Sequence, residues 1–337
     1  MPPLATIGIL SIGEMGMGIA KLLVAHNYRV VTNLEGRSAD TQTRVKAAAI
    51  ESVPSDSSLV TESDYIFSIV PPRDAVATAK RITNAFTSLT TPKSSPLYYL
   101  DLNAISPNTA RTIANLISTE TPAIKFLDGG IIGGAPSRKD APEKSTTTSS
   151  IPSTSHTWNR PSIPVSGPHP LSKAPISGPT LEALLNIKHL SSEIGPASGL
   201  KMCFATTTKG FTALCIQAFT TASRLGVLEE LQTEMSERVP GLYKTSNSVV
   251  SMPPKAYRWV EEMKEIGRTH GVDGGFDFEE RDGERGIFDA VAEVYRVVAD
   301  ETVLGEEKTE RRKRGRTVDD VALAMGDGLA AKRKRSE

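Results

Sequence analysis

The first 130 residues alternate between two patterns of apolar and polar positions. Short apolar runs, such as 5–10 and 65–70, predict buried strands, and the segments between runs repeat apolar residues at helical spacing. Repeated strand–helix–strand units with continuously apolar strands are typical of a parallel sheet covered by helices on both faces. Further strands are predicted at 28–32, 50–53, 97–101 and 124–128, and helices at 16–26, 40–49, 73–86 and from Ser106-Pro107 onward.

The pattern changes twice after these strands. Residues 137–157 are rich in Ser, Thr and Pro, which predicts a flexible insertion. Two short apolar segments, 163–166 and 187–192, would complete the sheet, and the spacing beyond Gly199 is helical. We therefore expect an α/β protein: an N-terminal Rossmann doubly wound parallel sheet over 1–192, followed by an all-α C-terminal domain over 193–337. Helices are predicted there at 200–231, 256–269, 287–304 and 318–331.

Composition narrows the class of partner. The 39 basic and 39 acidic residues cancel, so no overall field steers the chain to nucleic acid or to an anionic membrane. No apolar run of about eighteen residues predicts a membrane span, and the N-terminus lacks a signal-peptide pattern. Cys203 and Cys215 would stand about 18 Å apart on one helix, too far to form a disulfide, which favours a reducing compartment and a cytoplasmic location.

Two basic runs, 311–314 and 332–335, leave nuclear import or a nucleic-acid patch as an alternative. Solvated helix ends are the more economical interpretation, because the chain as a whole is neutral. The five histidines are scattered without the spacing of a zinc site, so we expect no metal.

The first strand leads into a glycine-spaced turn. Ser11, Gly13 and Gly16 occupy the three positions of G-x-G-x-x-G, after a strand and before a helix, which is the context of a dinucleotide-binding loop. Gly13 would let the backbone approach a pyrophosphate and Gly16 would let helix pack on strand, while Ser11 can serve if its φ is not positive. The predicted cofactor-binding residues of the loop are Ser11, Ile12, Gly13, Glu14, Met15 and Gly16.

The tip of the second strand bears on the choice of dinucleotide. An acidic residue here would hold a ribose 2′-hydroxyl, but this tip is Asn33, and Arg37 and Ser38 follow. Since arginine binds a phosphate through two parallel hydrogen bonds, these three residues favour NADP over NAD. Glu35 is the counter-evidence, because it is close enough in sequence to bind a 2′-hydroxyl.

Several motifs along the chain together resemble those of the 6-phosphogluconate dehydrogenase/β-hydroxyacid dehydrogenase superfamily. "IGILSIGEMGMGIAKLL" resembles its opening G-x-G-x-M-G segment, with Met15 in the methionine position. "SIVPP" (68–72) resembles a segment that contacts the adenosine side of the cofactor, which implies contacts from Val70, Pro71 and Pro72. Stretches near the C-terminus, "MPPKAYRWVEEM" and "ADETVLGEEKTERRKRG", are similar to a 6-phosphogluconate dehydrogenase-like branch with a poorly characterised helical domain.

Three further motifs carry the expected substrate site. "DLNAISP" (101–107) resembles the segment beside the nicotinamide and places Asn103 against cofactor and substrate. "FLDGGIIGG" (126–134) resembles a substrate-clamping segment, in which Ile132 replaces a serine and the N–H groups of Gly133 and Gly134 would face a carboxylate. "GPASGLKMCFA" (195–205) resembles the segment of the catalytic lysine; Lys201 takes that position, but Ala205 replaces the family's substrate-binding asparagine.

A lysine suits alcohol oxidation because the hydroxyl proton must leave as the carbonyl forms. Lys209 follows Lys201 by two helical turns and would share its face, giving a cationic stripe for an anionic or carbonyl-bearing substrate. We therefore expect an NADP-dependent oxidoreductase of a small hydroxyacid-like substrate, with Lys201 as general acid/base and Lys209 as a substrate contact. The alternatives are an imine (C=N) reductase of the same architecture and a catalytically inactive NADP-binding regulator. The resemblance also implies a homodimer through the helical domain, with no nucleic-acid or membrane partner.

Overall fold

The computed structural model describes residues 1–36, 39–139, 158–276, 286–307 and 311–336. The chain divides into two compact units, Met1–Lys201 and Met202–Glu337. The division falls within helix α7 (Pro196–Ala205) rather than at the expected 192/193 boundary, because this helix runs from one unit into the next.

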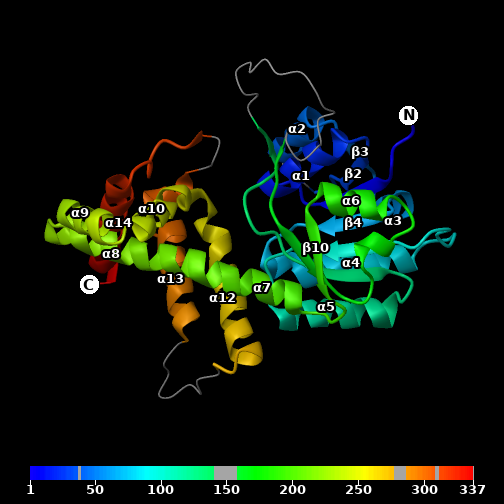
Figure 1. The fold of residues 1–337 in the computed structure, drawn as a ribbon. Helices are drawn as coiled ribbons and strands as arrows, with labels where there is room; N and C mark the ends of the chain where they lie inside the picture. The colour runs from blue at the N-terminus through cyan, green and yellow to red at the C-terminus, as the bar shows by residue number, and fades with distance from the viewer. Residues whose placement is uncertain (37–38, 140–157, 277–285, 308–310, 337) are drawn as a thin grey trace, which may run out of the picture. The chain divides into compact units, whose positions relative to one another are not determined.

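The N-terminal unit contains an eight-stranded sheet in the order β10-β9-β6-β5-β4-β1-β2-β3 (Figure 1). Six strands, from β3 to β6 in that order, are parallel, as the apolar runs predict. The last two run the other way: β9 pairs antiparallel with β6, and β10 pairs parallel with β9. The strands are β1 (Thr6–Leu10), β2 (Arg29–Asn33), β3 (Glu51–Val53), β4 (Tyr65–Ser68), β5 (Tyr98–Asp101), β6 (Lys125–Gly129), β9 (Ile163–Ser166) and β10 (Ile187–Ser191).

Helices cover both faces of this sheet, and each face has its own core. One core joins α1 and α6 to the sheet, and the other joins α3, α4 and α5. Ser106 begins α5 as predicted: its hydroxyl accepts the Thr109 N–H at 3.2 Å, and Pro107 fills the first helical position. The helices are α1 (Glu14–Val24), α2 (Ala39–Ala47), α3 (Asp56–Glu62), α4 (Ala75–Thr87), α5 (Pro107–Glu120) and α6 (Gly178–Leu184).

The first two residues of the flexible insertion expected at 137–157 are part of a regular strand. Residues Ser137–Arg138 form a strand, β7, that pairs antiparallel with β8 (Trp158–Asn159). Arg138 also lies over the Trp158 ring, 5.7 Å from its centroid. Residues 140–157 lie outside the described part of the chain.

The C-terminal unit is helical, but the single long helix expected over 200–231 is wrong. It is interrupted by a π-helical turn at Thr206–Gly210 and ends at Gly226, whose φ of 74° forms a left-handed cap. None of the described helices is both long and apolar enough to cross a lipid bilayer. The unit contains α8 (Phe211–Leu225), α9 (Leu228–Arg238), α10 (Pro240–Ser246), α11 (Ser248–Ser251), α12 (Ala256–Arg268), α13 (Ile287–Asp300) and α14 (Val318–Ser336).

Candidate functional site

A row of polar side chains ends the central strands of the sheet. The strand registers align Ser68 with Asp101, Asp101 with Asp128, and Asp128 with Ser166. All four side chains are fully buried. The parallel strands β1, β4, β5 and β6 have their carboxyl ends here, and ligands bind at this edge of open α/β sheets.

The glycine-spaced turn follows β1 at this edge. Ser11 has a φ of 74°, so the condition set for a serine at this position, a φ that is not positive, is not met. The turn does take the left-handed conformation that usually favours glycine, and the serine adopts it. Gly16 is required for close packing, because a Cβ there would lie 2.4 Å from the Ser11 carbonyl oxygen.

The surroundings of Gly13 fit a pyrophosphate. A Cβ added at Gly13 would meet no atom of the described residues within 4 Å, so among these residues the space beside this backbone is open. Gly13 begins α1, and no side chain in the described ranges caps that helix end. Its first N–H groups therefore remain available for phosphate oxygens. Ile12 is buried, Met15 is half-buried, and Glu14 is exposed.

Asn33, at the tip of β2, is bound within the protein. Its Nδ2 donates to Asp56 at 2.9 Å, and its Oδ1 accepts the Glu35 N–H at 2.9 Å. Arg81 also binds Asp56, through two hydrogen bonds of 2.9 and 3.0 Å. Asn33 thus shapes the turn that leads to residues 37–38, and Arg37 and Ser38 themselves lie outside the described residues.

Asn103 joins the ends of β4 and β5. Its Oδ1 accepts the Val70 N–H at 2.7 Å, and its Nδ2 donates to the Ser68 hydroxyl and the Asp101 carboxylate, each at 2.9 Å. Both amide hydrogens of Asn103 are bound within the protein, and the residue is only 2% exposed. These contacts favour a structural role for the side chain over the expected direct contact with cofactor or substrate. It holds in place the backbone of Val70, which precedes Pro71 and Pro72. Burial raises the pKa of Asp101 to about 7, against the hydrogen bonds from Asn103.

Asp128 anchors the helix that carries Lys201. One carboxylate oxygen accepts the N–H groups of Gly195 and Ser198, at 3.0 and 3.2 Å, and the Ser166 hydroxyl at 2.9 Å. The other accepts the Ser198 hydroxyl, and Ser166 Oγ in turn accepts the Ala197 N–H at 3.1 Å. Burial raises the pKa of Asp128, while these hydrogen bonds oppose the rise. This capping role was missed in the sequence, where Asp128 has the pattern of a simple turn residue.

Lys201 lies against the segment that follows β6. A Cβ added at Gly130 would lie 2.8 Å from Lys201 Cβ and 3.1 Å from its Cγ, so only glycine leaves room for the lysine stem. Lys201 is partly exposed. The structure thus brings the predicted catalytic lysine to the edge of the sheet where β6 ends.

Gly133 and Gly134 continue the same segment. Gly133 has a φ of 121°, and a Cβ added at Gly134 would meet no atom within 4 Å in the part of the chain that the structure describes. The segment then passes α1, where a Cβ on Gly18 would lie 2.9 Å from that of Ala135. The predicted substrate clamp therefore borders the helix that follows the glycine turn.

Lys209 belongs to a different cluster, within the helical unit. Its ammonium pairs with Glu262 and lies 4.9 Å from the centroid of the Trp259 ring. Trp259 packs edge-on against Tyr295, 5.2 Å away. These contacts favour a packing role over the expected substrate contact. The family's asparagine position, Ala205, is only 1% exposed.

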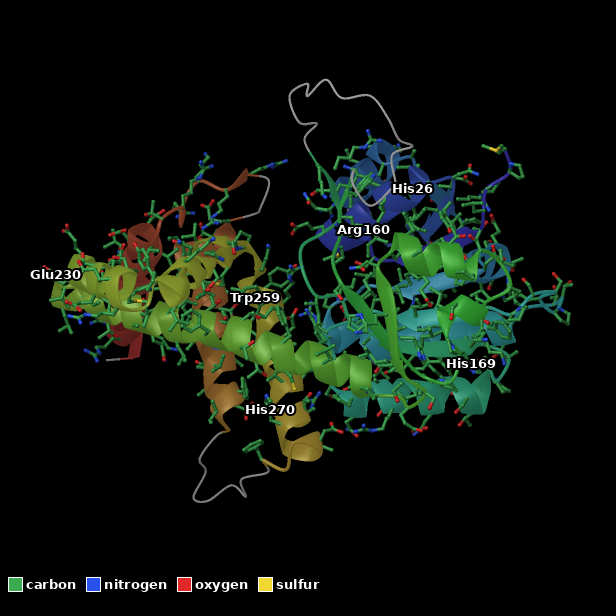
Figure 2. All side chains as sticks on the ribbon, in the orientation of Figure 1. His26, Arg160, His169, Glu230, Trp259 and His270 are labelled. Atoms are coloured by element: carbon green, nitrogen blue, oxygen red, sulfur yellow. The ribbon has the colours of Figure 1, made fainter. Side chains whose placement is uncertain are left out.

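Other titratable groups do not add to the site. Among the described residues, no group of three or more His, Cys, Asp and Glu side chains is arranged to hold a metal ion. His26 and His169 lie on opposite sides of the N-terminal unit (Figure 2). In the basic runs, Arg314 pairs with Glu307 at 2.7 Å and Lys332 with Glu301 at 3.1 Å.

The glycine turn generates a paired prediction. Gly16→Ala should lower the free energy of unfolding by about 2–3 kcal/mol, because its methyl group would collide with the Ser11 carbonyl. Gly13→Ala should change it by less than about 1 kcal/mol but weaken dinucleotide binding, since its methyl group would occupy the open space. Urea unfolding and fluorescence titration with NADPH measure the two effects. Equal stability of both variants would contradict this packing.

Asp128→Asn should destabilise the chain by about 1–3 kcal/mol, because the hydrogen bonds from the Gly195 and Ser198 N–H groups lose their charged acceptor and an NH2 group replaces the oxygen that accepts the Ser198 hydroxyl. Hydrogen exchange at residues 195–198 should accelerate more than exchange in β1. Asp74→Asn, at an exposed carboxylate, is the matched control and should leave both measurements unchanged. Unaltered exchange in Asp128→Asn would refute the anchoring role.

Comparison with known proteins gives two family matches, one in each part of the chain. Residues 6–145 match the family described as "NAD binding domain of 6-phosphogluconate dehydrogenase", and residues 222–298 match a "Domain of unknown function (DUF1932)". An uncharacterized 28.5 kDa protein of Methanothermus fervidus is 25% identical over 238 residues, which cover 68% of this chain and 76% of that protein.

Two solved structures show the same fold. The 3-hydroxyisobutyrate dehydrogenase of Mycobacterium tuberculosis, solved with L-serine, has a TM-score of 0.57 at 17% identity, covering 95% of this chain and 98% of that one. An imine reductase variant from Myxococcus stipitatus, solved with NAD+, has a TM-score of 0.50 at 17% identity, covering 88% and 93%. Residues 6–145 thus resemble the NAD-binding domain of 6-phosphogluconate dehydrogenase, and residues 222–298 resemble the DUF1932 domain.

Proposed function

We propose that this protein is an NADP-dependent dehydrogenase of a small hydroxyacid-like substrate, with Lys201 as general acid/base. The match of residues 6–145 to the NAD-binding domain of 6-phosphogluconate dehydrogenase supports the class, an oxidoreductase acting on CH–OH groups. The observation that carries the finer proposal is the anchoring of α7. Asp128 and Ser166 hold the start of this helix at the carboxyl edge of the sheet, and Lys201 extends from it over Gly130.

We assign the roles in cofactor binding, proton transfer and substrate binding from the positions of the residues. The N–H groups at the start of α1 would hold the pyrophosphate beside Gly13, and Asn103 holds the backbone of Val70 through its Oδ1. A bound nicotinamide supplies the acceptor or donor of hydride. Lys201 Nζ takes the hydroxyl proton when the alcohol is oxidised and returns it when the carbonyl is reduced. The N–H groups of Gly133 and Gly134 face an anionic or carbonyl oxygen of the substrate.

NADP is the proposed cofactor, with NAD as the alternative. Asn33 replaces the acidic residue that would repel a 2′-phosphate, and its turn leads directly to Arg37 and Ser38. Asp56 accepts a hydrogen bond from Asn33, and the guanidinium of Arg81 balances the negative charge of this carboxylate.

An imine reductase is the second candidate function, because a solved imine reductase shares the fold. A regulator that binds NADP without turnover is the third, motivated by Ala205 and Ile132 in place of the family's polar residues.

We also propose a homodimer formed by the helical unit. Large apolar side chains are exposed there: Leu225 is 71% exposed, Leu323 61% and Leu214 59%. Exposed apolar surface of this kind is typical of protein–protein contacts. No nucleic-acid or membrane partner is proposed.

The role of Lys201 is tested by Lys201→Gln. NADP+ reduction should be followed with a panel of hydroxyacids, and NADPH oxidation with a panel of aldehydes and imines, together with NADPH binding. Turnover should fall by at least about 100-fold while the NADPH dissociation constant stays within about twofold, because only the proton transfer is removed. Lys188→Gln, at an exposed lysine of β10, should match the parent. Unchanged turnover would remove Lys201 from the mechanism, turnover of imines alone would favour the reductase, and binding without any turnover would favour the regulator.

The choice of cofactor is tested by Arg37→Ala. The NADPH dissociation constant should rise by about 10-fold or more, since a charge-assisted contact to the 2′-phosphate is lost. NADH binding should stay unchanged, because NADH lacks that phosphate. Arg73→Ala, at an exposed arginine of the same unit, is the control. Equal weakening of both cofactors would contradict a 2′-phosphate contact.

A further inference from the structure

Two carboxylates lie side by side within the sheet. Asp101 ends β5, Asp128 lies near the end of β6, and the two residues are partners in the register of these parallel strands. Both are completely buried. In the described part of the chain, neither forms an ion pair with a lysine, arginine or histidine. Burial and mutual repulsion together oppose a second negative charge, so one member of the pair takes up a proton more readily than an ordinary aspartate.

The two carboxylates differ in the hydrogen bonds that favour their charge. Asp128 accepts two backbone N–H groups and two serine hydroxyls. Within the described ranges, Asp101 accepts only the backbone N–H and the Nδ2 of Asn103, at 3.0 and 2.9 Å. Hydrogen bonds to the ionised form stabilise it, so Asp128 keeps the charge and Asp101 takes the proton. In agreement, burial raises the pKa of Asp101 to about 7, and the charge of Asp128 adds to the rise.

The other titratable groups around Asp101 do not neutralise it. Burial, followed by the nearby charge of Asp101, raises the pKa of Tyr99 on β5, so this phenol stays neutral. The cations on the surrounding elements lie against other groups: Arg73 against Asp74, Arg81 of α4 against Asp56, Arg111 of α5 beside Gly195, and Lys201 of α7 over Gly130. The charge state of Asp101 therefore depends on burial, on Asp128 and on Asn103.

Asn103 connects Asp101 to the surface beside the glycine turn. Its Oδ1 accepts the Val70 N–H at 2.7 Å, while its Nδ2 donates to Asp101. The preceding residue, Ile69, donates its N–H at 3.2 Å to the carbonyl of Leu10, the last residue before the glycine turn. Since Ile69 and Val70 are half-buried, the hydrogen-bonded chain that starts at the buried carboxylate reaches accessible surface there.

The charge of Asp101 decides which way the amide of Asn103 points. An ionised carboxylate only accepts hydrogen bonds, so the NH2 group faces it and Oδ1 is left for the Val70 N–H. When the carboxyl group is protonated, its O–H becomes a donor, and Oδ1 can turn to accept it. The NH2 group would then face the Val70 N–H, and the Val70 backbone would lose its acceptor.

We propose that Asp101 is a positioning residue for the bound dinucleotide: its ionised carboxylate fixes the amide of Asn103, which in turn holds the Val70 backbone beside the glycine turn. Protonation of Asp101 releases that backbone, so dinucleotide affinity rises as the pH increases through neutrality. By linkage, the dinucleotide favours the ionised form, and its binding releases a proton. The inference rests on the proposed function in one respect, the assignment of the glycine turn as the dinucleotide site.

Fluorescence titration of the full chain with NADH, between about pH 6 and about pH 8.5, tests this role. NADH is the probe because the 2′-phosphate of NADPH itself titrates at about pH 6. The dissociation constant of the parent should fall at least about fivefold over this range, because the ionised fraction of Asp101 grows. Asp101→Asn, which cannot ionise, should bind equally at every pH, with the affinity that the parent has at the lower pH.

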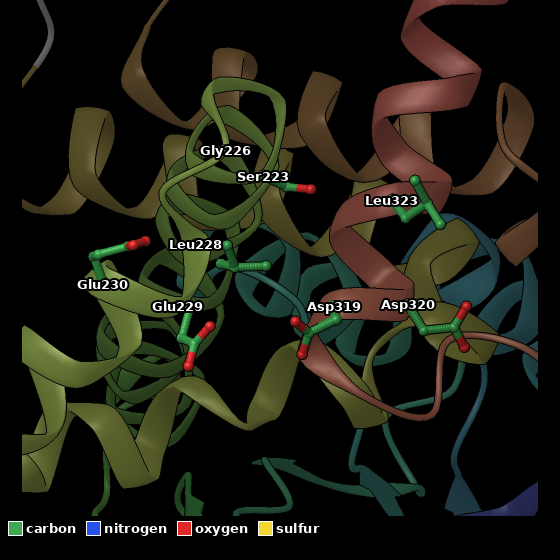
Figure 3. Close-up of a pocket in the computed structure, with 8 residues that line it drawn as sticks. All are labelled: Ser223, Gly226, Leu228, Glu229, Glu230, Asp319, Asp320 and Leu323. Carbon is green, nitrogen blue, oxygen red and sulfur yellow. The ribbon is translucent and has the colours of Figure 1, made fainter.

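The matched control is Asp319→Asn, at an exposed aspartate that lines a hollow in the helical unit (Figure 3). It should keep the pH dependence of the parent. A parent whose affinity does not change with pH, or an Asp101→Asn variant that retains the parent's dependence, would overturn the positioning role.

Hydrogen exchange of the ligand-free parent gives a second measurement, which decides the question if Asp101→Asn does not fold. The protection factor of the Val70 amide, corrected for the intrinsic exchange rate, should rise at least about fivefold over the same pH range. The amide of Lys125, whose N–H donates to the Leu97 carbonyl at the opposite end of the strands, should not follow it. Constant protection at Val70, or an equal change at Lys125, would refute the release of the Val70 backbone.

The two proposals fail separately. NADH binding that depends on pH as expected, without turnover of any hydroxyacid, aldehyde or imine, would overturn the dehydrogenase and support the role of Asp101. Turnover together with pH-independent binding would overturn the role of Asp101 alone. A chain that binds no dinucleotide would overturn both.

Discussion

The site depends on one buried carboxylate. Asp128 ends a central strand, and its two oxygens accept hydrogen bonds from two backbone N–H groups and two serine hydroxyls. A buried carboxylate is costly unless it is hydrogen-bonded, and the start of a helix offers the N–H groups and the positive dipole that it needs. The same bonds satisfy the first turn of α7, which has no internal partners for these N–H groups. These hydrogen bonds between Asp128 and the first turn of α7 fix the direction of the helix, and the direction of the helix fixes the position of Lys201.

The parallel part of the sheet was predictable because apolar runs, helical spacing and turn residues agree along the first 130 residues. The reversed direction of β9 and β10 was not, because a short apolar segment such as 163–166 has the same pattern in either direction. The long helix expected over 200–231 failed for a local reason. Gly226 takes a left-handed conformation, and the π-helical turn at Thr206–Gly210 has no signature in the apolar spacing.

The motifs led to a cluster of elements but not to the internal contacts of their side chains. The glycine turn follows β1, the neighbouring strands β4, β5 and β6 are parallel, and Lys201 packs on Gly130 just after β6. Asn103, however, donates both amide hydrogens to Ser68 and Asp101 within the protein, and Asn33 donates to Asp56. Sequence reasoning treats a polar residue after a strand as a ligand, because it does not show which internal partners compete for it. The role of Asp128 was hidden for the same reason, since its partner Gly195 lies 67 residues further on.

The buried polar row also bears on the entropy of ligand binding. Strand ends and the loops beyond them are usually the most mobile parts of a sheet, and a ligand that binds there must order them. Here Ser68, Asp101, Asp128 and Ser166 are locked by hydrogen bonds to the segments that follow, including the Val70 turn and the start of α7. The ordering of these segments therefore takes place during folding. A dinucleotide that reaches this edge meets a preorganised surface, and more of its contact energy remains available as affinity.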